Sequence, residues 1–398
     1  MFKVGIECES IEGKNPMFGV GRMTVKLLEG VSRRPELERD YRFILYFKDN
    51  VPEFPFLKAP IFEIKRVPVP FFKNRLFPIY YFALLPMRLW FDRPDVMFWP
   101  NYMLPIIAFG KSVVMLTEDV YYETHEGQLP FRYRLAYGIF SWWTAKFATR
   151  IMAISETSRK NLAKLYHINP DRIVINYLGV DTLPFFAQGF EGRRIKGNYL
   201  LFVGQMFPRR HAKETILAFE KLLANYSQIL ENLRIVNLRL IMVGPDKYPE
   251  AMIDPLIKQA NDNLGGNAVV HKDYVSDDEL NELYANAKAL IYVSDREAFG
   301  LPPMEALSFG VPPIIADNEL SHELFGARPE ETKSLFGDYA FYSKSGDVDD
   351  ITDAIKQALT DTRKIQNIKN SGPEFVKKYN WKSFADRWIN IIQKCHEK

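Results

Sequence analysis

The sequence contains only two cysteines, Cys8 and Cys395, which stand near opposite ends of its 398 residues. Two such distant cysteines exclude a disulfide framework and a zinc site built from thiolates, so we expect a chain that works in a reducing compartment. An excess of one charge is missing too, because 52 Lys and Arg residues face 49 Asp and Glu residues, giving a net charge of +3. We therefore expect no nucleic-acid partner, which would require a strongly basic surface.

Long apolar runs and internal repeats are also absent from the sequence. No stretch reaches the roughly 20 apolar residues that cross a bilayer, and acids stand where a secretory signal needs an apolar run. We therefore expect a cytoplasmic protein. The lack of short-period repeats excludes a solenoid, while 47% apolar and 25% charged residues are typical of globular domains.

Aromatic residues, by contrast, are abundant and make up 14% of the chain. Residues 71–91 and 131–150 combine them with basic residues. We interpret both stretches as buried helices and loops of a large domain, since basic side chains often extend across an apolar core. Peripheral contact with the inner face of a membrane stays open as the alternative, because aromatic and basic residues together suit the headgroup region.

Short β-rich runs alternate with helical patterns along the whole chain, which predicts parallel α/β architecture. We expect two Rossmann-like doubly wound domains that face a cleft, residues 1–185 and 186–375, with 184–197 as a linker. Residues 376–398 follow with a helical pattern. The strands are expected at 2–8, 43–47, 96–99, 112–116, 151–154 and 173–176, and then at 199–203, 238–243, 268–270, 289–293, 313–316 and 340–342.

The segment most informative about chemistry is 289–316, where a buried strand is followed by a polar loop and by a helix that Pro302 and Pro303 open. Backbone N–H groups at the start of a helix favour an anion. A glycine at this point also lets a ligand approach the backbone closely. The amides expected to face the anion belong to Phe299, Gly300 and Leu301.

Two acids accompany this loop. Glu297 stands at its mouth and Glu305 is expected in the first turn of the helix, where carboxylates can accept hydrogen bonds from sugar hydroxyls. A lone acid would more often be solvated or would complement the helix dipole. Because the strand, the loop, the two prolines and the paired acids coincide, we favour a site for a sugar nucleotide.

Two further glycine turns follow predicted strands. Gly204 leads to Arg209 and Arg210, whose guanidinium groups can bind phosphate in a bidentate manner; a solvated basic turn is the alternative. Gly19 and Gly21 form half of a dinucleotide fingerprint, but the third glycine is missing and NAD is not expected. A turn on which substrate lies against the backbone remains the favoured interpretation.

Together, these segments resemble the retaining GT-B-fold glycosyltransferases, a large family that includes many bacterial mannosyltransferases. The strongest element is REAFGLPPMEALSFGVPPIIA, in which Glu297 and Glu305 match the family's Glu–seven residues–Glu motif. The resemblance implies that Glu297 contacts the donor sugar and that Glu305 holds the nucleotide ribose. It also implies that Arg209 and Arg210, within GQMFPRRH, face the donor diphosphate. The remaining donor-binding residues that it implies are Gly204, Phe299, Gly300, Leu301, Gly19 and Gly21.

The same resemblance implies roles for the domains. The first would bind the acceptor, the second would bind the nucleotide sugar, and residues 376–398 would form a helix that crosses back to the first domain. One departure concerns the end of the fourth expected strand, where the family usually has a His-Asp pair at the reaction centre. Here Glu118 and Asp119 stand at these positions, so we include both among the candidate catalytic residues, with a shifted role or lost activity as alternatives.

These observations lead to one predicted function. We expect an enzyme that transfers a hexose, with mannose from GDP-mannose favoured, to a glycan or lipid-linked acceptor with retention of configuration. The sequence has no clear Asp-x-Asp metal site, so no metal and no cofactor are expected. Two alternatives stay open: a sugar-nucleotide epimerase of the same fold, and an inactive nucleotide-sugar-binding partner protein.

Overall fold

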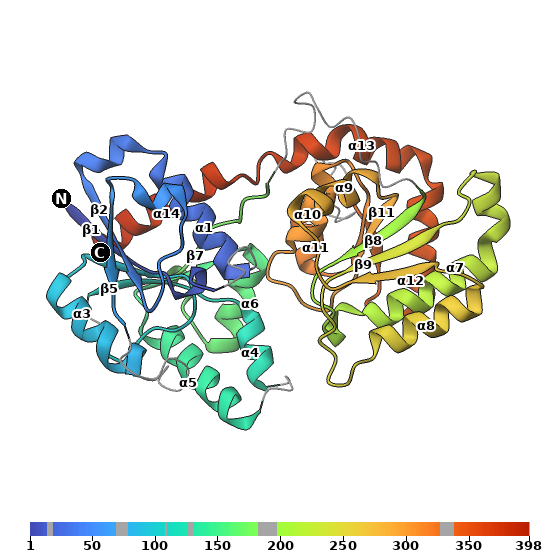
Figure 1. Cartoon of the computed structure of the whole chain (residues 1–398). Helices are drawn as coiled ribbons and strands as arrows, with labels where there is room; N and C mark the ends of the chain where they lie inside the picture. The colour runs from blue at the N-terminus through green and yellow to red at the C-terminus, as the bar shows by residue number, and fades with distance from the viewer. Residues whose placement is uncertain are drawn as a thin grey trace. The chain divides into compact units, whose positions relative to one another are not determined.

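The computed structural model describes residues 1–13, 19–68, 79–107, 110–125, 130–181, 197–326 and 338–397. The chain forms two compact units (Figure 1). Unit 1 comprises Met1–Gly179 together with Trp381–Lys398, and unit 2 comprises Val180–Asn380. The divisions of the chain therefore fall after Gly179 and after Asn380, where the sequence predicts 185 and 375.

Unit 1 contains seven parallel strands in the order β3-β2-β1-β4-β5-β6-β7. This order is doubly wound, because the chain begins in the middle of the sheet, runs to one edge, and then returns to build the other half. The structure confirms the strands expected here and adds β3, which alternates apolar with charged residues at the sheet edge and therefore has no apolar run. The strands are β1 (Phe2–Glu7), β2 (Tyr41–Phe47), β3 (Phe62–Arg66), β4 (Val96–Trp99), β5 (Lys111–Met115), β6 (Arg150–Ala153) and β7 (Ile173–Ile175).

Helices cover both faces of this sheet. Helices α1 and α14 pack together on one face, whereas η4, α3, α5 and α6 contribute to a core on the other. The helices are η1 (Glu9–Ile11), α1 (Gly19–Ser32), η2 (Pro35–Arg39), η3 (Pro55–Lys58), the π-helical turn η4 (Tyr80–Leu84), α3 (Leu85–Asp92), α4 (Glu118–His125), α5 (Phe131–Phe147), α6 (Glu156–Tyr166), η5 (Pro170–Arg172) and α14 (Trp381–Glu397).

The last helix, α14, belongs to unit 1 although it follows unit 2 in the sequence. It buries Trp388, Ile392 and Cys395, whose spacing of four and three residues forms one apolar stripe. The Trp388 ring lies 6.0 Å from that of Phe43 and 5.3 Å from that of Phe98, measured between ring centroids. These contacts with β2 and β4 fix α14 on the sheet of the first unit.

Unit 2 repeats the same winding with six parallel strands in the order β10-β9-β8-β11-β12-β13. All the strands expected in this half are present; β8 and β12 have the expected bounds, and those of the other four differ by one or two residues. The strands are β8 (Tyr199–Val203), β9 (Arg239–Val243), β10 (Val269–Lys272), β11 (Ala289–Tyr292), β12 (Pro313–Ala316) and β13 (Phe341–Ser343). The helices are η6 (Pro208–Arg210), α7 (Ala212–Asn232), α8 (Ile253–Leu264), α9 (Asp277–Asn286), α10 (Leu301–Ser308), α11 (Glu319–Phe325), α12 (Val348–Thr360) and α13 (Thr362–Val376).

The chain crosses between the units twice. At the first crossing, a side chain on Gly179 would clash with Trp381, because a Cβ atom would lie 2.4 Å from the Trp381 backbone nitrogen. Within unit 2, the Val180 N–H donates to the Tyr379 carbonyl over 2.9 Å. The expected linker at 184–197 lies outside the described residues except for Gly197. The helical pattern near the end forms two helices, α13 and α14, with the second crossing between them.

Both sheets place a reversal of strand order at their centre. Strand β1 lies between β2 and β4, and β8 lies between β9 and β11. In each sheet the chain therefore first builds the strands on one side of the central strand and then those on the other side. In doubly wound sheets the crevice at the carboxyl ends of these central strands is where ligands bind. The fold therefore draws attention to the loops after β1 and β4 in unit 1 and after β8 and β11 in unit 2.

Candidate functional site

The loops after β8 and β11 meet at the switch point of unit 2. Gly204, directly after β8, has a φ of 132°, which residues with a side chain rarely adopt. A Cβ atom there would lie 2.9 Å from Nη1 of Arg210. The neighbouring loop after β9 is equally tight, because a Cβ on Gly244 would lie 2.2 Å from the Gly204 carbonyl oxygen. Gly204 thus leaves the space that the Arg210 guanidinium occupies.

Arg210 and Glu297 form the central ion pair of this site. Arg210 Nε donates to Oε1 of Glu297 over 2.7 Å, and each side chain is only 15% exposed. Arg210 also donates from Nη1 to the Gln205 carbonyl over 3.1 Å, and its guanidinium lies 5.2 Å from the centre of the Tyr292 ring. The structure therefore brings together two residues, 87 positions apart, that the sequence assigns to one donor site.

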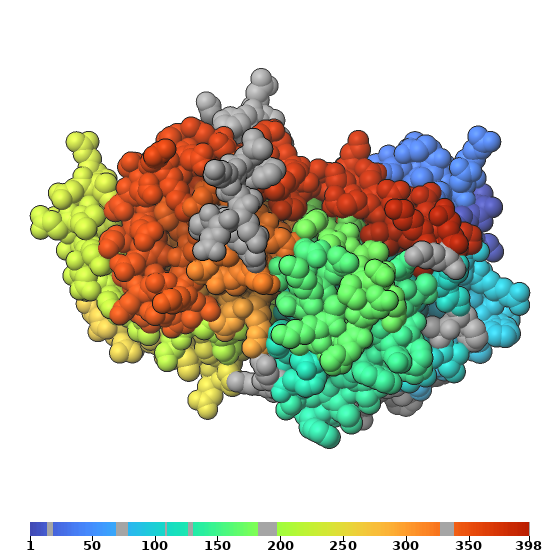
Figure 2. Space-filling model, turned by 180° about the vertical axis from the view of Figure 1, so that it is seen from behind, coloured from blue at the N-terminus to red at the C-terminus, as the bar shows by residue number. Residues whose placement is uncertain are grey.

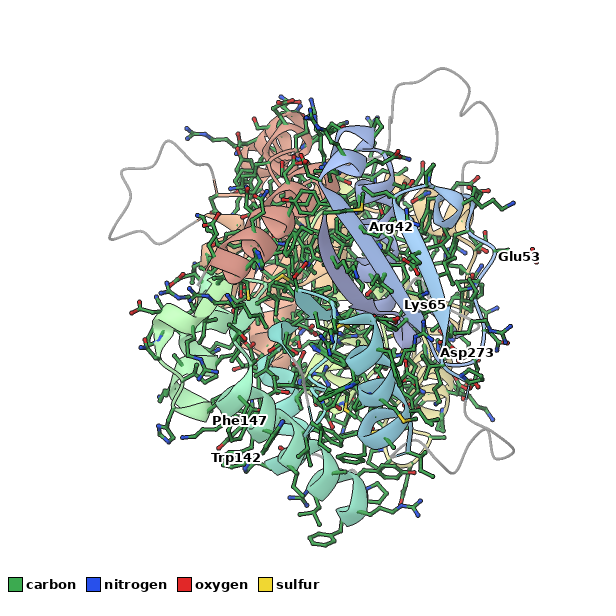
Figure 3. The ribbon with its side chains drawn as sticks, turned by 90° about the vertical axis from the view of Figure 1, so that its left-hand side faces the viewer. Arg42, Glu53, Lys65, Trp142, Phe147 and Asp273 are labelled. Carbon is green, nitrogen blue, oxygen red and sulfur yellow. The ribbon has the colours of Figure 1, made fainter. Side chains whose placement is uncertain are left out.

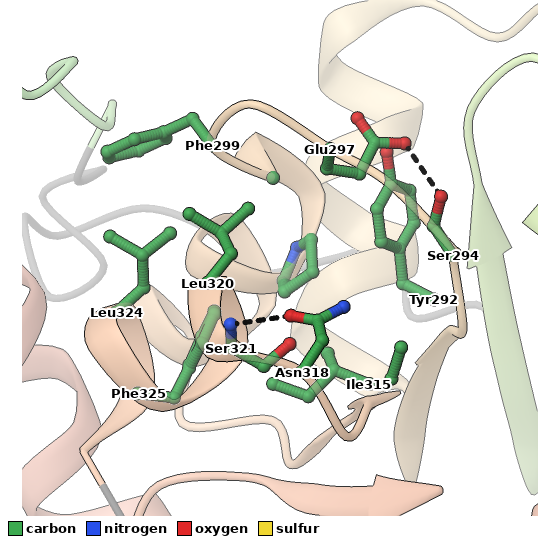
Figure 4. Close-up of a pocket in the computed structure, with 13 residues that line it drawn as sticks. Tyr292, Ser294, Glu297, Phe299, Ile315, Asn318, Leu320, Ser321, Leu324 and Phe325 are labelled. Carbon is green, nitrogen blue, oxygen red and sulfur yellow. Dashed lines mark hydrogen bonds between the residues drawn. The ribbon is translucent and has the colours of Figure 1, made fainter. Parts of the chain in front are cut away.

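Two further side chains hold the Glu297 carboxylate. Ser294 Oγ donates to Oε1 of Glu297 over 3.2 Å (Figure 4). Tyr292 also bonds to Glu297, and burial, reinforced by the Glu297 charge, raises the pKa of the Tyr292 hydroxyl well above its usual value. The hydroxyl therefore stays protonated and can keep donating. The sequence predicted neither residue, because nothing in a strand-end Tyr or Ser marks it as a partner of an acid further along the loop.

Arg209 takes a different position from Arg210. Its guanidinium lies 4.6 Å from the centre of the Phe207 ring, a cation–π distance. Its carbonyl accepts the backbone N–H of Asp295 over 2.9 Å. Arg209 thereby joins the loop after β8 to the loop after β11 through the main chain.

His211 adds a second connection between the same loops. Its Nε2 lies 2.8 Å from Asp295 Oδ1 and its Nδ1 lies 3.4 Å from Glu214 Oε2. Burial alone would lower the pKa of His211, but the hydrogen bonds and charges of Asp295 and Glu214 outweigh it and raise the pKa to about 9. The imidazole is therefore positively charged at neutral pH. No sequence pattern predicted a role for His211, although it directly follows the two candidate arginines.

The start of helix α10 supplies the other side of the site. Gly300 precedes the helix with a φ of 85°, in the left-handed region, and Pro302 and Pro303 occupy the first turn. A Cβ on Gly300 would meet nothing closer than 4.0 Å, so the requirement there is conformational rather than spatial. Phe299, Gly300 and Glu297 line a small hollow together with the start of α11 (Figure 4). Its remaining lining residues include Asn318, Ser321, Leu324 and Phe325.

Glu305 differs from the expectation in position and environment. It lies in the second turn of α10, not the first, because the helix begins at Leu301. Its side chain is buried, and Oε2 accepts a hydrogen bond from the Tyr284 hydroxyl over 2.8 Å. A role limited to complementing the helix dipole does not explain this partner. Tyr284 comes from α9, and no pattern within the motif could have indicated it.

In unit 1, the structure places Glu118 away from open solvent. It is the first residue of α4 and is 2% exposed. Its Oε2 accepts a short hydrogen bond from Ser158 Oγ, and its Oε1 accepts one from Asn161 Nδ2 over 3.2 Å. These two donors lie on α6, so the carboxylate joins α4 to α6. Asp119 follows in the same first turn.

Gly19 and Gly21 are part of helix α1 itself. Gly19 is its first residue, with a φ of 51°, and Gly21 is buried within the first turn. The sequence instead predicts a glycine turn at these two positions. Residues 14–18, between η1 and α1, lie outside the described residues.

Comparison with known proteins adds to this geometry. Residues 187–375 match the family of glycosyl transferases group 1, and residues 19–182 match glycosyltransferase family 4. The chain belongs to this glycosyltransferase family.

It is 26% identical over 259 residues to the O-antigen chain mannosyltransferase B of Escherichia coli, covering 62% of this chain and 61% of that protein. It is 24% identical over 261 residues to the O-antigen chain mannosyltransferase RfbU of Salmonella typhimurium, covering 64% and 66%. The matched part thus spans less than two thirds of each relative.

Solved structures show the fold of this glycosyltransferase. WaaG, a glycosyltransferase involved in lipopolysaccharide biosynthesis, matches with a TM-score of 0.65 at 19% identity, covering 98% of this chain and 99% of WaaG. HepE from Anabaena, solved in complex with UDP-glucose, matches with a TM-score of 0.67 at 15% identity, covering 99% and 100%. The fold is GT-B, as the resemblance implied.

The glycosyltransferase also has a polar network at the switch point of unit 1, which no sequence motif indicated. Glu7 ends β1, is fully buried, and accepts hydrogen bonds from the Glu9 backbone N–H at 2.7 Å and from Asn101 Nδ2 at 3.2 Å. Burial, and then the nearby Glu9 charge, raise the pKa of Glu7 to about 8. Glu9 in turn accepts hydrogen bonds from Tyr81 and Lys48, at 2.6 and 2.9 Å. The network joins the loops after β1, β2 and β4.

The acids and histidines of the chain do not assemble into a metal site where the structure describes them. Within the described parts of the glycosyltransferase, no three His, Cys, Asp or Glu side chains come together as metal ligands would. An Asp-x-Asp sequence does occur at Asp347-Val348-Asp349, but Asp347 caps helix α12 by accepting the N–H groups of Asp349 and Asp350. The Asp347 carboxylate therefore has a structural use at a helix start.

Proposed function

We propose that this glycosyltransferase transfers a hexose from a nucleotide diphosphate sugar to an acceptor hydroxyl, with retention of anomeric configuration. GDP-mannose is the donor that we propose first, because the O-antigen relatives named above are mannosyltransferases. The acceptor that we propose is a glycan or a lipid-linked glycan. Family membership supports the reaction class, and the site in unit 2 supports the position of the donor.

The ion pair of Arg210 and Glu297 is the observation that supports this function best. It lies at the switch point of unit 2, beside the N-terminal end of α10, whose amides and dipole favour phosphate. A donor diphosphate between Arg210 and the amides at Phe299–Leu301 would place its sugar near the Glu297 carboxylate. Glu305, oriented by Tyr284, would accept hydrogen bonds from the ribose hydroxyls.

The chemical difficulty of the reaction is the negative charge that develops on the departing diphosphate. Arg210, Arg209 and the amides of the α10 start would stabilise this charge, and fixed donors aimed at developing charge usually contribute more to catalysis than any other effect. The acceptor hydroxyl would attack the face from which the diphosphate leaves and would give its proton to the leaving phosphate oxygen. Such a reaction retains configuration without an enzymatic nucleophile. We propose that the reaction needs no metal ion, because the cationic side chains would neutralise the charge on the diphosphate.

Glu118 has a supporting role in this proposal. Its two carboxylate oxygens accept hydrogen bonds from Ser158 and Asn161, so we assign it to the connection of α4 with α6 rather than to contact with the sugar. The catalytic assignment of Asp119 remains the prediction made from the sequence.

A transfer assay tests the function. The purified protein is first screened by thermal shift with GDP-, UDP- and ADP-sugars, because a bound donor stabilises it by RT ln(1 + [L]/Kd). The stabilising donor is then incubated with candidate acceptors, and the anomeric configuration of the product is read by NMR. We expect Glu297→Ala and Arg210→Ala to abolish transfer, whereas the exposed controls Glu250→Ala and Arg363→Ala retain it.

Several results would contradict the proposal. Normal turnover by folded Glu297→Ala protein would remove the site assignment. An epimerised nucleotide sugar formed without any acceptor would identify an epimerase instead. Donor binding without turnover across the acceptor panel would identify an inactive binding protein, and loss of transfer in EDTA would contradict the proposed independence of metal.

A further inference from the structure

Helix α5 of unit 1 has an unusual exposed side. Its exposed residues are all apolar, aromatic or basic, namely Phe131, Arg132, Tyr133, Leu135, Ile139, Trp142, Lys146 and Phe147. Four of the large apolar side chains, each 49% to 78% exposed, follow one another at intervals of four, four and three residues, which places these four on one side of the helix. These are Phe131, Leu135, Ile139 and Trp142.

The opposite side of α5 is packed against the protein. Phe140, Ser141, Thr144 and Ala145 are buried there, and Thr144 Oγ1 donates to the Tyr102 carbonyl over 2.7 Å. A helix that anchors one side in a core normally shows charged and polar residues on the other. Helix α5 shows large apolar residues instead, so its exposed side needs an explanation that packing among the described residues of unit 1 does not supply.

A second segment of unit 1 also exposes large apolar side chains. In residues 79–93, the buried side consists of Tyr80, Tyr81, Leu85 and Leu89, so the interpretation of this stretch as a buried helix holds for one side only. Its other side exposes Ile79, Phe82, Met87, Trp90 and Phe91, with Phe91 exposed by 74%.

Contacts show that these segments are neighbours in unit 1. The Phe82 ring stacks on that of Phe140 in α5, with 5.4 Å between centroids. Trp143 of α5 donates from Nε1 to the Pro105 carbonyl over 3.3 Å, next to the exposed Ile106 and Ile107. We call the exposed apolar residues of α5, of 79–93 and of 106–107 the aromatic face. Figure 3 labels Trp142 and Phe147 at the outer side of α5, and the space-filling view in Figure 2 shows the teal α5 region at the molecular surface.

The charged side chains of α5 and of residues 79–93 favour an anionic partner. Arg132 and Lys146 flank the apolar side of α5, and Arg93 is exposed at the end of α3. Helix α5 contains no acid, and the only acid within 79–93 is Asp92, which Arg88 neutralises through an ion pair of 2.8 Å. A surface that combines Trp, Phe and Leu with basic side chains suits the headgroup region of an anionic bilayer.

The face lies along the surface and does not cross a membrane. None of the helices in the described part of the chain is long and apolar enough to span a bilayer. Helix α5 is held to its own unit through Thr144 and Phe140, so only its outer side is available to lipid. We propose that the aromatic face docks on an anionic lipid bilayer, with Phe131, Leu135 and Trp142 inserted among the headgroups and Arg132 and Lys146 paired with lipid phosphates. This proposal concerns unit 1 alone and is independent of the transfer reaction.

Vesicle co-sedimentation tests the proposal without donor or acceptor. Full-length protein is mixed with sucrose-loaded vesicles of phosphatidylcholine, with or without phosphatidylglycerol. We expect sedimentation with the phosphatidylglycerol vesicles only, and release of the protein as the salt concentration rises. In the variant Phe131→Ser/Leu135→Ser/Trp142→Ser we expect binding to fall at least tenfold. The matched control is Val236→Ser/Tyr274→Ser, which removes equally exposed apolar residues from unit 2 and should bind like the wild type.

The basic side chains are tested separately. Each basic residue near an anionic surface contributes about fivefold to binding, so Arg132→Glu/Lys146→Glu should lower binding by at least about 25-fold. The control Arg363→Glu/Lys258→Glu reverses two exposed charges in unit 2 and should lower it far less. Circular dichroism and the melting temperature verify that each variant is folded. We expect all of them to fold, because the substituted residues are exposed.

Several outcomes would overturn the proposal. They are failure of the wild type to bind either kind of vesicle, undiminished binding by the folded aromatic variant, and an equal loss in the unit 2 controls. A fourth outcome is that the protein associates with itself in the absence of lipid and that the aromatic substitutions abolish this association. That result would show that the face binds a second copy of the chain. Equal binding to both kinds of vesicle would reject the anionic partner.

Discussion

Arg210 Nε and Glu297 Oε1 lie 2.7 Å apart, and this ion pair joins two loops that end neighbouring strands of one sheet. Either residue alone would be a partly buried charge. Together they neutralise each other while Ser294 and Tyr292 complete the hydrogen bonding of the carboxylate. The site is therefore a connected arrangement within unit 2, and its parts should depend on each other energetically.

That dependence can be measured with a double-mutant cycle. Arg210→Ala, Glu297→Ala and the double variant are unfolded in denaturant, and their free energies of unfolding are compared with that of the wild type. Groups in direct contact typically show coupling of about 0.5–3 kcal/mol, and we expect the double variant to lose less stability than the sum of the single ones. The pair Arg210→Ala and Glu250→Ala, whose members do not contact each other, should be additive. Additivity in the first cycle would show that the pair contributes nothing to the site.

Tyr284 is predicted to orient Glu305 for the nucleotide. Tyr284→Phe removes the hydroxyl that donates to Glu305 over 2.8 Å but keeps the ring that stacks on Phe309. A lost hydrogen bond to a charged group is worth about 1.5–3 kcal/mol, so we expect the donor KM to rise roughly tenfold or more while kcat changes little. The control is Tyr199→Phe. This substitution also removes a buried hydroxyl, but one that donates to the Leu283 carbonyl over 2.8 Å and not to Glu305. A similar change of KM in both variants would mean that Tyr284 acts through packing alone.

Glu118 tests the departure from the usual His. Because its oxygens accept hydrogen bonds from the buried Ser158 and the half-buried Asn161, Glu118→Ala would take the acceptor from both donors and leave that of Ser158 unsatisfied. Unsatisfied buried groups cost about 1–3 kcal/mol each, so the variant should unfold at lower denaturant concentration. Ser158→Ala, which removes one of the donors, should be destabilised less. The thermal shift produced by a donor should be the same in Glu118→Ala as in the wild type, and loss of that shift would mean that Glu118 contacts the donor.

The sequence and the structure agree where the signal is local. Strands β4, β8 and β12 have the predicted bounds, because a short apolar run between polar loops can be recognised without knowing its neighbours. Strand β3 was missed since its charged residues alternate with apolar ones at a sheet edge. The sequence singled out Glu297 and Arg210 because strand ends and glycine turns mark their loops, and the structure brings the two together. The partners that orient the acids were not found, because Tyr284 reaches Glu305 from another helix and Ser158 reaches Glu118 from 40 residues away. Such pairings depend on tertiary packing that no local pattern encodes.

Glu7 should make the stability of unit 1 depend on pH. Burial and the neighbouring Glu9 charge raise the pKa of Glu7 from 4.5 to about 8, so the folded state keeps a proton that the unfolded chain has already lost. Wherever the folded state binds more protons, stability falls as pH rises. The contribution of Glu7 to stability is therefore fully favourable below about pH 4.5, declines between about pH 4.5 and about pH 8, and levels off above that.

Glu7→Gln is neutral at every pH and should remove this decline, so that the melting temperature of the variant exceeds that of the wild type most at the alkaline end. The exposed control Glu250→Gln should follow the wild type throughout. A decline that persists unchanged in Glu7→Gln would show that the proton is held elsewhere in the network around Glu9.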